Sequence, residues 1–87
     1  MYNIMKVEIK NSECTPTKIK TLIDYFLALY DVPKWEHNGL IVEIDPTFDF
    51  KGDDTLIRWT DINEGFNDKV IVNSLEEFQS KFRLIHA

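Results

Sequence analysis

The stretch TPTKIKTLIDYFLALYDVPKWEHNGLIVEID, residues 15–45, changes from a helical to a strand period and so decides the fold class. In its first half, apolar residues recur at the spacing of a helix with one buried face: Ile19, Leu22, Ile23, Phe26 and Tyr30. Thr15 offers an N-cap, and Pro16 suits the first helical position, where a missing N–H costs nothing. Pro33 disfavours helical geometry at Val32, so the helix should end near Tyr30.

The second half of the stretch predicts a turn followed by a strand. Asn38-Gly39 is a tight-turn pair. Directly after it, apolar and other residues alternate from Leu40 to Asp45, which is typical of a strand with one buried face. A helix and a β-strand therefore lie side by side in the sequence, which favours an α+β or α/β domain.

Further strands are predicted on both sides of this stretch. Met5–Lys10 alternates apolar residues with charged ones, and Thr55–Ile62 and Lys69–Asn73 also have the composition of strands. Residues 46–54 are predicted to be a loop because they contain Pro46, Gly52 and three aspartates. A second turn-rich segment, residues 63–68, should join the last two strands into an antiparallel meander.

The end of the chain predicts a second helix. Ser74 and Glu77 have the S-x-x-E spacing of a capping box, and Leu75, Phe78 and Phe82 would share one face of the helix that follows. The predicted order is β-α-β-β-β-α. We expect one small α+β domain over residues 1–87, with a mostly antiparallel four-stranded sheet and two helices packed on one face.

Length and composition favour a folded protein of the cytoplasm. The chain has 87 residues, enough for a single domain, and 44% of them are hydrophobic, which argues against disorder despite the charge. The lone Cys14 cannot form an internal disulfide, as is typical of a reducing compartment. No stretch approaches the roughly 20 apolar residues that a membrane-spanning helix needs, so we expect no membrane association.

The sequence contains no recognisable catalytic or cofactor motif, so we expect a non-enzyme without a metal or cofactor. Cys14, His37 and His86 lack the short spacings of a zinc site or a catalytic pair. Residues 61–65 begin like a calcium-binding EF-hand loop, but glycine comes one position early, and Val72 stands where glutamate is required. Direct nucleic-acid binding is disfavoured because the predicted sheet strands carry acidic residues.

The acidity of the chain is confined to residues 35–68, which hold nine carboxylates against two bases, Lys51 and Arg58. A block of charge indicates one surface whose field attracts a positive partner. Aromatic residues accompany the acids and could serve as anchors in an interface. The predicted partner-binding residues are Trp35, Glu36, Glu43, Asp45, Phe48, Asp49, Asp53, Asp54, Trp59, Asp61, Glu64 and Asp68. For Trp35 and Trp59, the alternative of a place in the core stays open.

In size, charge and compactness the chain resembles the small acidic inhibitors encoded by phages and mobile elements, including DNA mimics and anti-CRISPR proteins. The resemblance implies a binding protein that covers a basic, nucleic-acid-binding surface of a larger protein. Three alternatives stay open. They are an immunity or antitoxin-type inhibitor of a nuclease, a structural or assembly subunit that could form a homodimer through an open sheet, and a small metal-dependent enzyme that uses the acidic loop 49–54.

Overall fold

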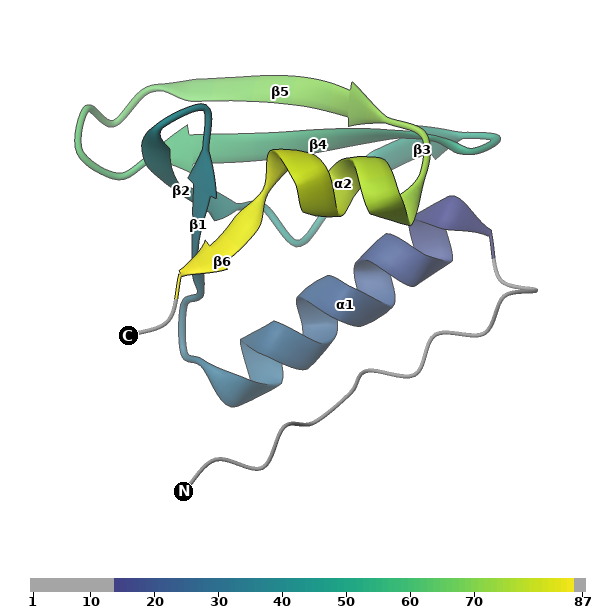
Figure 1. Ribbon diagram of the computed structural model, residues 1–87, viewed down its shortest axis with the longest axis horizontal. Coiled ribbons are helices and arrows are strands. Elements are labelled where there is room, and N and C mark those ends of the chain that lie inside the picture. The colour runs from purple at the N-terminus through teal and green to yellow at the C-terminus, as the bar shows by residue number, and fades with distance from the viewer. Residues whose placement is uncertain (1–13, 86–87) are drawn as a thin grey trace.

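The computed structural model describes residues 14–85, which form an antiparallel six-stranded sheet with both helices on one face (Figure 1). In chain order the elements are α1 (Thr15–Leu29), β1 (Lys34–His37), β2 (Leu40–Ile44), β3 (Asp49–Lys51), β4 (Asp54–Asp61), β5 (Asn67–Val72), α2 (Leu75–Lys81) and β6 (Arg83–Ile85). The predicted α+β class is confirmed. The predicted order and the count of four strands are wrong, and the predicted strand Met5–Lys10 lies outside the described residues.

Strand β4 is the centre of the sheet. β5 pairs with one side of it from Thr55 to Thr60, whereas β2 and β3 pair one after the other with its opposite side. β1 then pairs with β2, and β6 pairs with β1. The antiparallel meander predicted for the three longest strands is therefore confirmed, with β3 as an addition.

A bulge separates β2 from β3. Ile44 lies opposite Trp59 and Asp49 lies opposite Leu56, so four residues, 45–48, stand opposite only Ile57 and Arg58. Extra residues of this kind bend a strand and break its ladder locally. The bulge explains why the predicted loop 46–54 in fact contains the short strand β3. Pro46 and Gly52 flank that strand without entering it.

The core lies between the sheet and the two helices. On β4 every second residue is buried, namely Thr55, Ile57, Trp59 and Asp61. α1 adds Ile19, Leu22 and Ile23, and α2 adds Phe78, so the predicted apolar faces of both helices are confirmed in contact with the core. The other face of the sheet carries no helix in the described part of the chain (Figure 1).

The ends of the helices differ in how well the sequence predicted them. At α1 the N-cap is Cys14 and not Thr15, and no side-chain bond caps it, whereas the end at Leu29 agrees with the prediction. At α2 the capping box is confirmed: the Ser74 hydroxyl accepts the Glu77 N–H at 3.0 Å. The Glu77 carboxylate accepts the backbone N–H of Asn73 at 2.8 Å.

The chain leaves α2 earlier than the sequence predicted. Phe82 was expected on the helix but is its C-cap, and the chain continues into β6, which pairs with β1. Phe82 stays in the core, where it is 1% exposed. The place of Phe82 in the core agrees with the sequence pattern, whereas its extended backbone does not.

The β1–β2 hairpin turns through two residues in the left-handed region, Asn38 with φ 52° and Gly39 with φ 79°. His37 lies opposite Leu40, so the loop has two residues, which is the geometry that Asn-Gly favours. The turn predicted at Asn38-Gly39 is confirmed. The strand Lys34–His37 before it was missed.

We predict that Gly39→Val lowers the free energy of unfolding by about 1–2 kcal/mol, the cost of left-handed backbone for a residue with a Cβ. A Cβ at Gly39 would meet no atom within 4 Å, so the loss reports backbone conformation alone. Gly39→Asn is the control and should retain most of the stability, because asparagine tolerates this region. Urea unfolding followed by the fluorescence of the buried Trp35 and Trp59 measures both, and equal stability of the two variants would contradict the prediction.

Candidate functional site

Three of the twelve residues predicted to bind a partner are buried. Trp35, Trp59 and Asp61 are 3%, 5% and 1% exposed. Both tryptophans belong to the core cluster, which is the alternative that the sequence left open. In this conformation none of the three presents a side chain to a partner, so the candidate surface consists of the other nine.

Asp61 has a structural role in the loop after β4. One carboxylate oxygen, Oδ1, accepts the backbone N–H groups of Asn63 at 2.8 Å and of Glu64 at 3.3 Å. The other oxygen, Oδ2, is buried and makes no hydrogen bond with any residue from 14 to 85. Bonds from a side chain to nearby backbone N–H groups are typical of aspartate in turns. Residues 61–65, which begin like a calcium loop, therefore form an aspartate-stabilised turn.

Three more acids form ion pairs on the face of the sheet opposite the helices. Glu43 binds Lys34 at 3.1 Å, Asp49 binds Arg58 at 2.5 Å, and Glu36 lies 3.8 Å from Arg83. The strand register sets these pairs, because each joins side chains that share one face on paired strands. Exposed pairs add little stability, but they neutralise the middle of the acidic band.

The remaining acids of the band are exposed and form no ion pair with any residue from 14 to 85: Asp45, Asp53, Asp54, Glu64 and Asp68. Asp53 and Asp54 lie at the turn between β3 and β4, whereas Glu64 and Asp68 lie around the loop between β4 and β5. These turns are at opposite ends of β4 (Figure 1). Because β4 has eight residues, its ends are about 24 Å apart.

Aromatic side chains lie near one of these acidic ends. Phe48 is half-buried, and Phe50 is 65% exposed. Together with Pro16 and Pro46 they line a shallow depression of about 260 Å³ between the start of α1 and the bulge. Phe50 was not among the predicted site residues. An alternating pattern around it could have indicated β3, but the neighbouring aspartates and Gly52 favoured a loop.

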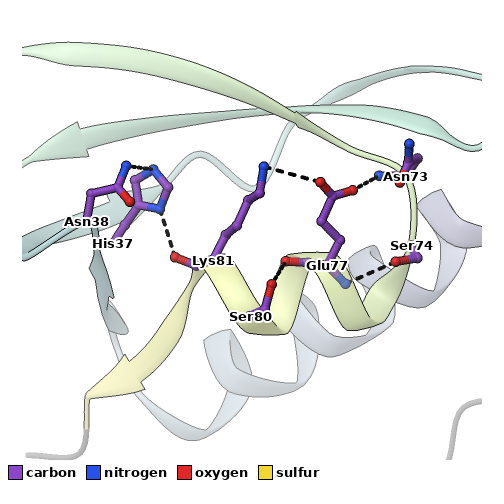
Figure 2. A network of polar contacts seen from close by, with 7 residues as sticks. All are labelled: His37, Asn38, Asn73, Ser74, Glu77, Ser80 and Lys81. Carbon is purple, nitrogen blue, oxygen red and sulfur yellow. Dashed lines mark hydrogen bonds and ion pairs between the residues drawn. The ribbon is translucent and has the colours of Figure 1, made fainter.

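A polar network joins the β1–β2 hairpin to the C-terminus of α2 (Figure 2). The His37 Nδ1 donates to the carbonyl oxygen of Lys81 at 2.8 Å, which satisfies one of the carbonyls that a helix end leaves unpaired. The imidazole stacks on the ring of Phe82, with 4.2 Å between the ring centroids, and makes a T-shaped contact with Trp59, with 5.0 Å between the centroids. His37 therefore links β1 to the end of α2 within the core, where its side chain is 3% exposed.

The same network lowers the pKa of Glu77. The first cause is the hydrogen bond from the backbone N–H of Asn73, and the second is the Lys81 ammonium, whose nitrogen lies 3.2 Å from the carboxylate. Both interactions favour the charged form of Glu77. Glu77 thereby connects the start of α2 to its last turn (Figure 2).

A pocket of about 210 Å³ lies next to this network, between β5, the hairpin and α2. Its lining includes Trp59, Asp68, Val70 and Lys81. The indole N–H of Trp59 is buried and makes no hydrogen bond with any residue in the described range 14–85. Asp68 stands directly opposite Trp59 in the strand register. The Asp68 carboxylate accepts the backbone N–H of Lys69 at 2.7 Å and forms no ion pair with any residue from 14 to 85. Lys69 and Lys81 also line the pocket, which thus combines an aromatic wall with a carboxylate and two lysines.

The opposite face of the sheet has a shallower depression of about 480 Å³. Arg58 and Lys69 lie opposite each other there, while Asp45 and Asp68 lie at its border. Arg58 is already bound to Asp49. The mixed charges leave this depression without one dominant sign.

The described residues hold no group of three or more histidine, cysteine, aspartate or glutamate side chains placed to bind a metal ion. Cys14 is an exposed thiol whose pKa is lowered, first by its hydrogen bond with the Thr17 hydroxyl at 3.1 Å and then by the Thr17 backbone. His86 lies outside the described residues.

No protein-family model, curated protein or solved structure matches this chain. Within residues 14–85, neither helix has the length and apolar character needed to cross a membrane. Functional inference therefore rests on the geometry described above.

The lowered pKa of Glu77 predicts how the stability of the domain depends on pH. A carboxylate with a depressed pKa in the folded state adds stability above its unfolded pKa, about 4.3, and loses it as the pH falls through the folded value. Glu77→Gln should therefore be less stable than the wild type at pH 7, and the difference should shrink below about pH 4.3.

Chemical denaturation at a series of pH values measures this difference. Glu76→Gln is the matched control, because Glu76 is exposed, follows the same cap and makes no ion pair among the described residues. The free energy of unfolding of Glu76→Gln should differ from that of the wild type by a smaller amount at every pH than that of Glu77→Gln does. A gap between wild type and Glu77→Gln that stayed constant down to pH 2 would contradict the role given to Glu77.

Proposed function

We propose that the chain is a non-enzymatic binding protein that docks on a basic surface of a larger protein. The observation that supports this most directly is the division of the acids into two groups. Three acids on the outer face of the sheet, Glu36, Glu43 and Asp49, are neutralised by ion pairs. Four acids at or next to the two ends of β4 are exposed and form no ion pair among residues 14–85, and Asp45 in the bulge is a fifth of this kind: the four are Asp53, Asp54, Glu64 and Asp68. Unpaired exposed charge costs a free protein little, and it steers association with an opposite charge.

The separation of the two acidic ends supports an extended basic target. They lie about 24 Å apart, too far to meet one lysine or arginine cluster. A basic groove that holds nucleic acid extends over such a distance, so a nucleic-acid-processing enzyme is the partner that we favour. Imitation of a phosphate track would depend on the loops, because Glu36, Glu43 and Asp49 are already paired on the strands.

An inhibitor is the simplest role for such a protein, because a domain that covers the nucleic-acid-binding groove of an enzyme blocks its substrate. The proposal includes inhibitors of the phage or mobile-element type and immunity proteins directed at a nuclease, both acting in the cytoplasm. The identity of the bound enzyme separates these two. A metal-dependent enzyme built on residues 49–54 has less support, because Asp49 is held by Arg58.

Two variants with the same change in charge test the proposal. The loop variant carries Asp53→Asn, Asp54→Asn and Glu64→Gln, and the sheet variant carries Glu36→Gln, Glu43→Gln and Asp49→Asn. Tagged protein captures partners from a lysate of the source cells, and the association rate of the captured partner is then measured. We predict a rate at least about tenfold slower for the loop variant than for the sheet variant.

The salt dependence completes this test. Raising the ionic strength should slow association of the wild type, because exposed charges are screened beyond about 8–10 Å. Equal rates for the two variants, or a rate insensitive to salt, would contradict docking through the loops. Capture of a basic nuclease would favour the immunity-type role within the same proposal.

A further inference from the structure

Strand β5 has one edge whose backbone groups point away from the sheet. The Asp61 N–H donates to the carbonyl of Phe66 at 2.9 Å, and the Ile62 N–H donates to the carbonyl of Ile41 at 3.1 Å. Because neighbouring residues of a strand direct their backbone groups to opposite sides, the odd-numbered residues of β4 bond to β5. The register then turns the N–H and C=O groups of Asn67, Lys69 and Ile71 outward. The Lys69 N–H donates locally to the Asp68 carboxylate at 2.7 Å, so an added strand has to displace or share that bond.

That edge is regular and accessible. Its pairing with β4 runs without interruption over six residue pairs, and it contains no proline. Within residues 14–85, β5 pairs with β4 alone. Ile71 is 57% exposed. Natural sheets usually protect such edges with bulges, prolines or charges, and β5 has only Asp68 and Lys69 among these devices.

A pocket lies beside the edge, on the side of the helices. Asp68 and Val70 line this pocket, and both are residues of β5 whose backbone groups bond to β4. A strand added to β5 would direct every second side chain toward this pocket and the Asp68 carboxylate, which has no ion pair among the described residues. Strand addition commonly obtains affinity from backbone bonds and specificity from such a side-chain pocket.

The charges around β5 favour an added strand with a positive charge. Glu64 and Asp68 lie at its start, and Asp54 and Glu76 lie near its end, all exposed and without an ion pair among the described residues. Lys69 is the single base on the strand. Two more bases lie nearby, and each is held in an ion pair: Arg58, opposite Lys69, binds Asp49, and Lys81, at the pocket, binds Glu77. A second copy of the chain would bring a net charge of −5 against this surface. An extended basic segment of another protein meets favourable charges instead.

We propose that β5 accepts an extended basic segment of a partner protein as an additional strand, with a lysine or arginine of that segment in the pocket beside Asp68. This inference rests on the proposed function and names how the partner is held. The acids at the ends of β4 attract the partner. The outward N–H and C=O groups of Asn67 and Ile71 and the outward C=O of Lys69 bind it.

A labelled peptide of alternating lysine and valine with blocked ends is the probe, and fluorescence anisotropy measures its dissociation constant for the full chain. A glutamate–valine peptide is its control and should not bind. Ile71→Pro removes an outward N–H without removing a bond to β4, and edge strands tolerate proline at such positions. We expect it to weaken binding about tenfold, the loss of one hydrogen bond.

Ile71→Ala keeps the N–H and should weaken binding by about threefold or less. The inference would be overturned if Ile71→Pro bound the lysine peptide as tightly as the wild type. It would also be overturned if the wild type bound both peptides equally, or bound neither of them. If Ile71→Pro does not fold, the test is a comparison, by NMR, of the amide chemical shifts of the wild type with and without the lysine peptide. Shifts at Asn67, Lys69 and Ile71 on addition of the lysine peptide support the inference, and unchanged shifts overturn it.

The loop variant separates this inference from the proposed function. Weak binding by the loop variant together with normal binding by Ile71→Pro would overturn strand addition and leave electrostatic docking intact. Weak binding of the lysine peptide by Ile71→Pro together with normal binding by the loop variant would overturn electrostatic docking and leave strand addition intact. Dimerisation of the wild type that Ile71→Pro abolishes would overturn the basic partner in favour of a second copy.

Discussion

The whole domain depends on the pairing of β4 on both of its sides. Eight residues of one strand hold β5 along one side and β2 and β3 along the other, while their buried side chains form the floor of the core. The two helices cover that floor, and Trp59 links it to His37 and Phe66 through ring contacts. Because a strand has only two sides, full use of β4 leaves β5 as the long strand at the edge.

The same pairing decides which acids are available to a partner. Glu43 and Asp49 face bases because the register places them on the outer face beside Lys34 and Arg58. Asp53 and Glu64 lie in turns outside the strands, and Asp54 lies at the first position of β4, opposite Lys51 but without an ion pair among residues 14–85. The acidic band of residues 35–68 thus becomes two acidic ends in space. The electrostatic character of the protein is a product of strand register as much as of composition.

The sequence predicted the elements that have a clear period or a clear cap. The apolar spacing of α1, the alternation of β2, the Asn38-Gly39 turn and the capping box at Ser74 are all in place. It missed β1, β3 and β6, which have four, three and three residues. Strands so short contain one or two alternations, and pairing with a neighbour, which the local sequence does not encode, makes them strands. β1 was recoverable, since a two-residue Asn-Gly hairpin needs a strand on each side.

Hydrogen exchange of the backbone amides, followed by NMR on the wild-type chain alone, tests the central role of β4 most directly. The described structure predicts slow exchange along the whole of β4 and an alternating pattern on β5, slow at Asp68, Val70 and Val72 and fast at Asn67 and Ile71, with Lys69 between them because its N–H donates to the Asp68 carboxylate. Uniformly slow exchange along β5 would show that its outer edge is already paired. That result would contradict the free edge of β5, and fast exchange of every second amide of β4 would contradict the pairing of β4 on both sides.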